Sequence, residues 1–137
     1  MVKDEMPSNK IRSNYFGLTF NSPIILLSGC VGFGDEYTRV DGYSNSDVGG
    51  ICLKGTTLDE RLGNIPQRIY ETSDGMINAI GLQNPGADYV IDNILPSLNF
   101  NETNFIANIS GASVDEYVAI VKKFDNSNIN ALEINIS

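Results

Sequence analysis

The feature that most constrains the fold is the alternation of short apolar runs with longer amphipathic stretches. Four runs, at residues 24–27, 51–53, 105–109 and 131–136, are rich in β-branched residues and are followed by Ser or Lys, which predicts short strands. Each run is apolar on both faces, so both faces of the sheet need covering. Such strands alternating with helices predict an α/β fold built on a parallel sheet.

Two of the amphipathic stretches have helical periodicity. Apolar residues recur every three or four positions over residues 87–98, and the dipeptide at 84–85 supplies an asparagine N-cap followed by proline at the first helical position. A second apolar stripe covers residues 114–124, where Ser113 and Glu116 have the spacing of a capping box. Both stretches are therefore predicted to be helices between strands.

Weaker patterns surround these elements. An acidic first turn favours a helix over residues 35–43, and residues 15–20 with a turn at 21–23 are expected to form a small β-hairpin arm. We expect residues 1–14 to be a polar N-terminal extension and residues 15–137 to form one domain.

Two parallel architectures compete, the doubly wound sheet and the (β/α)8 TIM barrel. The glycines at 29–34 (GCVGFG) lack the G-x-G-x-x-G spacing of a dinucleotide-binding turn. Asn108 and Asn135 lie in two Asn-Ile-Ser strand ends 27 residues apart, and in a barrel the C-terminal strand ends carry the active site. Each Asn could instead simply terminate its strand. We predict a barrel of which this chain supplies the N-terminal half, about four strands, because a whole barrel needs about 250 residues.

Composition excludes several classes of function. A formal net charge of −8 disfavours binding to nucleic acid or to anionic membranes. The polar N-terminus and the lack of a long apolar run predict a cytoplasmic protein without a membrane anchor. The sequence has no histidine and only Cys30 and Cys52, both in apolar runs, so we expect buried thiols and no metal site.

Lys54 is the most informative charge, because it directly follows an apolar strand and precedes Gly55. A lysine there could simply extend to solvent. The amide- and glycine-rich segment 78–86 (NAIGLQNPG) has the composition of a loop that contacts a planar polar ligand, although an ordinary solvated loop has similar features.

Several motifs together resemble the dihydroorotate dehydrogenases. They are residues 21–24 (NSPI), 28–34 (SGCVGFG), 54–57 (KGTT), 78–86 (NAIGLQNPG), 108–111 (NISG) and 132–137 (LEINIS). The segment 78–86 and the GFGDEY stretch that ends at Tyr37 are most similar to class 1B, whose members use NAD.

The resemblance implies an oxidoreductase of pyrimidine biosynthesis, a flavoprotein that oxidises (S)-dihydroorotate to orotate by transferring a hydride to N5 of FMN. The implied FMN contacts are Ser28, Lys54, Gly55, Asn108 and Asn135. The implied substrate contacts are Lys54, Asn78, Ala79, Ile80, Gly81, Leu82 and Asn135.

The resemblance also implies partners. Class 1B catalytic subunits form homodimers within heterotetramers, with an electron-transfer subunit that carries FAD and an iron-sulfur cluster. In this family a cysteine just after the Asn-(Ile/Leu)-Ser strand end is the catalytic base, so here it is expected just after Ser137. We therefore expect these 137 residues alone to be inactive. The alternatives are another FMN barrel, such as a dihydropyrimidine dehydrogenase-like reductase, and a non-catalytic partial barrel.

Overall fold

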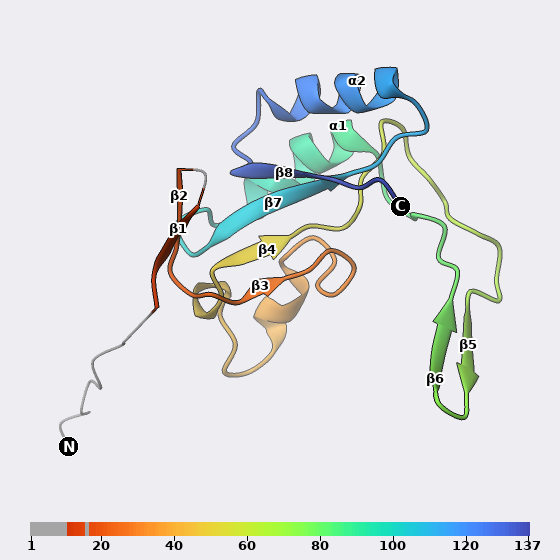
Figure 1. Ribbon diagram of the computed structural model, residues 1–137, viewed down its shortest axis with the longest axis horizontal. Helices are drawn as coiled ribbons and strands as arrows, with labels where there is room; N and C mark the ends of the chain where they lie inside the picture. Colours follow the sequence, from red (N-terminus) through yellow and green to blue (C-terminus); the bar gives the residue numbers. More distant parts are fainter. Residues whose placement is uncertain (1–10, 16) are drawn as a thin grey trace.

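A four-stranded parallel sheet forms the centre of the computed structural model, which describes residues 11–15 and 17–137. In spatial order its strands are Ile25–Leu26 (β3), Gly50–Cys52 (β4), Asn104–Ile109 (β7) and Ala131–Ile134 (β8). All neighbouring strands are parallel, so their C-terminal ends lie at the same edge, on the right in Figure 1. The predicted α/β fold and its four strands are confirmed, although β8 ends at Ile134 rather than at residue 136. The described residues form an open sheet and not a closed barrel.

Both strongly predicted helices are present. The first begins at Ala87 and changes its hydrogen bonding along its length, as an α-helical turn Ala87–Tyr89 (α1), a π-helical turn Val90–Ile94 and a 3₁₀ turn Leu95–Ser97. Its N-cap is Gly86 and not the predicted Asn84, because Gly86 has a φ of 86° and is not helical. No helix in the described ranges is long and apolar enough to cross a bilayer.

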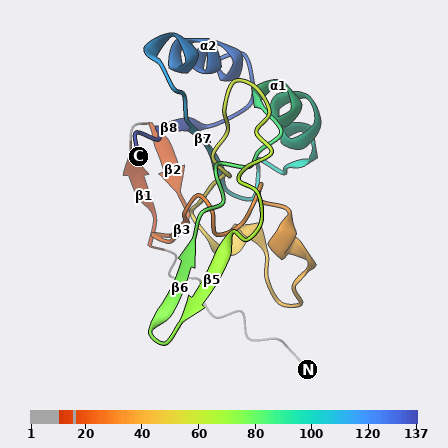
Figure 2. The ribbon, with the colours of Figure 1, turned by 90° about the vertical axis from the view of Figure 1, so that its right-hand side faces the viewer.

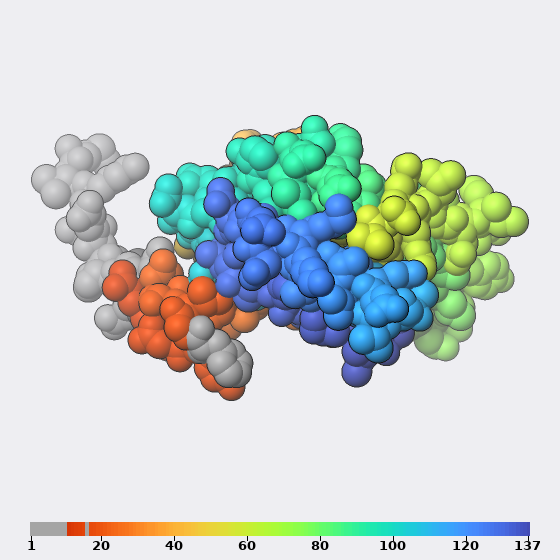
Figure 3. All heavy atoms as spheres, turned by 90° about the horizontal axis from the view of Figure 1, so that it is seen from above, coloured from red at the N-terminus to blue at the C-terminus, as the bar shows by residue number. Residues whose placement is uncertain are grey.

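The second helix is Val114–Phe124 (α2). The Ser113 hydroxyl accepts a hydrogen bond from the Glu116 amide at 3.2 Å. The Glu116 carboxylate accepts from the amide of Ala112 at 2.7 Å instead of that of Ser113, so half of the predicted capping box forms. In Figure 3 the atoms of α2 lie beside those of the segment Ala87–Ser97.

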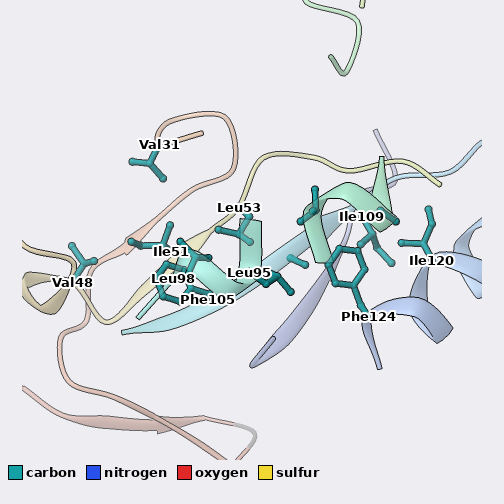
Figure 4. Packing of buried hydrophobic residues seen from close by; sticks show 13 residues of the cluster. Val31, Val48, Ile51, Leu53, Leu95, Leu98, Phe105, Ile109, Ile120 and Phe124 are labelled. Atoms are coloured by element: carbon teal, nitrogen blue, oxygen red, sulfur yellow. The ribbon is translucent and has the colours of Figure 1, made fainter. Parts of the chain in front are cut away.

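The helices bury one face of the sheet. Side chains from β4 and β7 pack against both helices in a continuous apolar cluster (Figure 4) that includes Ile51, Leu53, Phe105, Ala107, Ile109, Val90, Leu95, Ile120 and Phe124. Each fully buried Val, Leu, Ile or Phe side chain contributes about 1.5–3 kcal/mol to folding. The cluster therefore fixes the strands whose C-terminal ends carry the predicted site residues.

Two weaker predictions need correction. The N-terminal hairpin pairs Ser13–Tyr15 (β1) with Leu18–Phe20 (β2), so its turn lies between these strands and not at residues 21–23. The helix expected over residues 35–43 is reduced to a 3₁₀ turn at Glu36–Arg39, because Val40 is extended and Gly42 has a φ of 84°. Another 3₁₀ turn, Asn45–Asp47, precedes β4. Residues 1–10, most of the predicted extension, lie outside the described residues.

A second hairpin was not predicted. Ile69–Thr72 (β5) and Gly75–Asn78 (β6) pair antiparallel and project from the edge where the parallel strands end (Figures 1 and 2). Every residue of both strands is exposed. Arg68 fixes the base of the hairpin by donating to the Gln83 side chain at 2.6 Å and to the Leu62 carbonyl at 3.0 Å.

Candidate functional site

The predicted site residues gather at the C-terminal edge of the parallel sheet. Ser28 follows β3, Lys54 and Gly55 follow β4, Asn108 is next to last in β7, and Asn135 follows β8. Parallel strands place such residues side by side. The structure therefore brings these five residues together at one edge of the sheet.

A cavity of about 280 Å³ lies at this edge, between the sheet and the segment that follows β6. Its walls are Ser28, Gly29, Lys54, Gly55, Asn78, Ile80, Gly81, Leu82 and Asn135. A second hollow of about 480 Å³ shares Ser28 and Asn135 and adds Asn108 and Glu133. Of the predicted substrate contacts, Ala79 lines neither of these two hollows. It lines a separate hollow against β5 and β6, and its amide donates to the Arg68 carbonyl at 2.8 Å. Its side chain is therefore outside the set that the structure brings together.

Lys54 gives the cavity a positive charge. Its side chain is half-buried and forms no ion pair with a carboxylate among residues 11–15 and 17–137, where the ion pairs are Arg39–Asp35 and Lys123–Asp88. Its backbone is fixed, because the Lys54 amide donates to the Gly32 carbonyl at 2.7 Å. In a chain with a net charge of −8, this cavity is suited to a small anion.

Two asparagine side chains are joined at the rim. The Asn135 amide nitrogen donates to Asn108 Oδ1 at 3.3 Å, and Asn108 Nδ2 donates to Glu133 Oε1. Asn135 Oδ1 in turn accepts from the amide and the hydroxyl of Ser137, at 3.1 and 2.7 Å. The sequence prediction identified both asparagines but assigned no role to Glu133. The sequence did contain a sign of Glu133, because it is a charged residue in an apolar strand. It lies two positions before Asn135 and therefore on the same face.

The loop over the cavity has a constrained backbone. Gly81 has a φ of 78°, and a Cβ added there would lie 2.7 Å from the backbone nitrogen of Asn64, so only glycine fits. Leu82 has a φ of 52°, a left-handed conformation that is uncommon for a side chain with a Cβ. Such backbone outliers concentrate at ligand-binding positions.

Asn84 connects this loop to the sheet and was assigned only as a helix cap in the sequence. Its side chain is 4% exposed. Asn84 Oδ1 accepts from the amides of Thr57 and Gly86 at 3.1 and 2.9 Å, while Nδ2 donates to the Thr57 hydroxyl and the Leu82 carbonyl at 2.9 and 2.7 Å. These four hydrogen bonds come from one side chain and join Thr57 to Leu82 and Gly86. Asn84 therefore sets the position of the loop over the cavity.

The two cysteines differ in environment. Cys52 is buried, as predicted, and burial together with the charge of Glu133 and a hydrogen bond to it raises the pKa of its thiol to about 12. Cys30 is exposed, so the prediction of a buried thiol is wrong there. It lies in a turn after β3, where its amide donates to the Leu27 carbonyl at 3.1 Å, and not in the strand itself.

Comparison with known proteins identifies the family. A profile of the family described as dihydroorotate dehydrogenase matches residues 10–137. The chain is 45% identical over 130 residues to the dihydroorotate dehydrogenase B (NAD(+)) catalytic subunit of Anoxybacillus flavithermus, covering 94% of this chain and 41% of that protein. It is 47% identical over 124 residues to the protein of the same name from Petrotoga mobilis, covering 90% and 41%.

The chain thus spans about two fifths of the length of the curated relatives that it matches. The matched region contains every predicted site residue, from Ser28 to Asn135. On this match and on the gathered rim residues, the chain belongs to the dihydroorotate dehydrogenase family.

Proposed function

We propose that this chain is part of the catalytic subunit of a class 1B, NAD-linked dihydroorotate dehydrogenase. In this proposal its sheet is the N-terminal half of a (β/α)8 barrel that binds FMN and oxidises (S)-dihydroorotate to orotate in pyrimidine biosynthesis. The single observation that carries the proposal is the cavity at the C-terminal strand ends, where the Lys54 ammonium lies with the amides of Asn78 and Asn135.

The polar groups of this cavity suit dihydroorotate, which combines a carboxylate with a cyclic imide. The Lys54 ammonium supplies the charge that binds a carboxylate. Asn78 and Asn135 can each donate and accept hydrogen bonds, as the edge of the pyrimidine ring requires. Together the three side chains would fix both the position and the rotation of the ring in its own plane.

The rim also fits a flat cofactor. Gly55 is buried, and a Cβ there would lie 2.9 Å from Asn108 Oδ1, so the missing side chain brings the strand end and the Asn108 amide close together. Gly29 has open space where its Cβ would be. We propose that Ser28, Lys54, Gly55, Asn108 and Asn135 hold FMN. FMN, when bound, supplies the acceptor for the hydride that leaves substrate C6.

The proton that leaves substrate C5 needs a base. Cys52 is unsuitable because burial and Glu133 raise its pKa to about 12, and Cys30 is outside the residues that line the cavity. We propose that the base is a cysteine directly after Ser137. The names of the relatives, catalytic subunits of an NAD(+)-linked enzyme, support a partner subunit. We propose that this partner is an electron-transfer subunit with FAD and an iron-sulfur cluster, in a heterotetramer built on a catalytic homodimer.

Lys54→Ala in the full-length gene product tests this function. We expect the parent protein to purify with FMN and to oxidise dihydroorotate, and the variant to lose about 100-fold or more in kcat/KM, as when a group that stabilises developing charge is removed. Orotate affinity, measured by the change in flavin absorbance, should fall as well. The matched control is Lys123→Ala, which removes a lysine paired with Asp88 on the helix side and should leave both values unchanged.

The same assay separates the alternative enzyme. Dihydrouracil lacks the carboxylate, so an enzyme built for it would prefer that substrate and would depend little on Lys54. A parent protein that binds no flavin, or a Lys54→Ala variant with parental kcat/KM for dihydroorotate, would contradict the proposed function.

A further inference from the structure

We propose that Glu133 is a positioning residue, whose carboxyl group fixes the orientation of the Asn108 amide and, through it, that of the Asn135 amide at the ligand site. The inference rests on the proposed FMN and substrate site and adds to it a residue that touches neither ligand. It begins from the strand register, in which Asn108 and Glu133 are directly opposite each other in β7 and β8.

This pair lies on the face of the sheet that the helices leave open. The neighbours of Asn108 in β7, Ala107 and Ile109, belong to the apolar cluster under the helices. Alternation along a strand therefore directs Asn108 to the other face. Glu133 and Asn108 line the same hollow there, so the two polar side chains form a cross-strand pair.

The chemistry of the pair removes an ambiguity. An asparagine amide has a donor and an acceptor of nearly the same shape, and only its partners decide which way it faces. An ionised carboxylate only accepts hydrogen bonds. Because Glu133 Oε1 accepts from Asn108 Nδ2, Asn108 Oδ1 is turned towards Asn135.

The orientation then passes to the second amide. Asn108 Oδ1 accepts from Asn135 Nδ2 at 3.3 Å, which turns Asn135 Oδ1 towards Ser137, whose amide and hydroxyl both donate to it. One N–H of Asn135 Nδ2 is used by Asn108. The second N–H has no acceptor among the residues that the structure describes, so it can donate to a ligand in the cavity that Asn135 lines.

The environment of Cys52 is consistent with this position of the carboxyl group. The charge of Glu133 and a hydrogen bond to it are, after burial, the causes of the raised pKa of this thiol. Cys52 is 1% exposed, so the Glu133 carboxyl group lies near a buried thiol as well as at the Asn108 amide. The side chain of Glu133 is nevertheless exposed on its open side, so its removal should affect amide orientation more than stability.

The test is Glu133→Gln in the full-length protein, because glutamine keeps the shape but can present either a donor or an acceptor to Asn108. We expect FMN to bind about tenfold more weakly, as measured by quenching of flavin fluorescence, the effect expected for a hydrogen bond to a charged group. The side-chain NH₂ resonance of Asn108 should shift in the ¹⁵N–¹H spectrum of the flavin-free protein. Glu133→Asp keeps an acceptor-only group and should recover most of the FMN affinity.

Glu102→Gln is the matched control. Glu102 Oε1 also accepts from an asparagine, Asn99 Nδ2, at 3.0 Å, but the pair lies before β7, at the other end of the strand. This control makes the same change in net charge and should leave FMN affinity and the Asn108 resonance unchanged.

The outcomes separate the two proposals. A parent protein that binds no FMN overturns the proposed function, whereas a parent that binds FMN and a Glu133→Gln variant that binds it equally well overturn only the positioning role. Equal losses in Glu133→Gln and Glu102→Gln would show a general effect of charge and would also overturn it. Should Glu133→Gln fail to fold, an FMN affinity of Glu133→Asp below that of Glu102→Gln by more than tenfold would contradict the inference.

Discussion

The parallel sheet and the hairpin β5–β6 border the same cavity but are built differently. On the helix-covered face of β4 and β7 the apolar side chains are buried, and Ile51 and Phe105 are 0% exposed. In the hairpin, Tyr70 and Ile77 are 65% and 64% exposed, and Arg68 joins its base to the loop residues Leu62 and Gln83. The sheet thus supplies fixed positions for Lys54, Asn108 and Asn135, whereas the hairpin carries Asn78 on an element with little burial of its own.

The largest expected effect comes from the buried side of this comparison. Phe105→Ala removes a side chain that packs edge-on against Phe100, with ring centres 5.2 Å apart, and should lower the free energy of unfolding by about 3–5 kcal/mol. Urea unfolding without added flavin measures this loss. A loss below about 1 kcal/mol would show that β7 is less tightly packed than its burial indicates.

The strands of the sheet were predictable for the same reason that Phe105 is important. A strand whose apolar face is buried is rich in β-branched and aromatic residues. This pattern identified β4, β7 and β8 from the sequence. The ends of these strands then placed Lys54, Asn108 and Asn135 on one edge without any knowledge of side-chain contacts.

The hairpin gave no comparable signal. Its apolar residues face solvent, so alternation along β5 and β6 does not correspond to an inside and an outside. The contacts of Asn84 with Thr57 and of Glu133 with Asn108 were also beyond sequence reasoning, because they join residues 27 and 25 positions apart. A contact between two distant segments leaves no local periodicity by which to recognise it.

Asn84 joins the two regions, and its substitution should have the next largest effect. Asn84→Ala removes the acceptor of two buried amides, Thr57 and Gly86, and should cost about 2 kcal/mol. The loop of Gly81 and Leu82 should then lose protection in hydrogen exchange. The control is Asn93→Ala, where the exposed amide only donates to the Tyr89 carbonyl at 3.2 Å. Equal costs for both variants would contradict the role of Asn84.

The buried thiol of Cys52 should make the free energy of unfolding depend on pH. The pKa of Cys52 is raised from 9.0 to about 12, so the folded state keeps its proton where the unfolded state has lost it. The stabilisation is fully present below about pH 9 and is lost as pH rises towards 12, by up to about 1.4 kcal/mol per pH unit. Urea unfolding of the reduced protein should show this decline, and Cys52→Ala should remove it.

Cys30→Ala, which removes the exposed thiol, is the matched control for this measurement. A parental decline that persists in Cys52→Ala would show that other groups cause it. The titration of Cys52 would then make no contribution to the pH dependence of the free energy of unfolding.

The smallest effect is expected in the hairpin, from the counterpart of the Phe105 substitution. Tyr70→Ala also replaces an aromatic residue in a strand, but its side chain is 65% exposed, so the free energy of unfolding should change by only about 0.5 kcal/mol or less. Urea unfolding compares it directly with Phe105→Ala. A cost near that of Phe105→Ala would mean that the hairpin is covered in the folded protein and that its apolar face is a packing surface. A small cost would instead show that the strand leading towards Asn78 contributes little to the stability of the sheet.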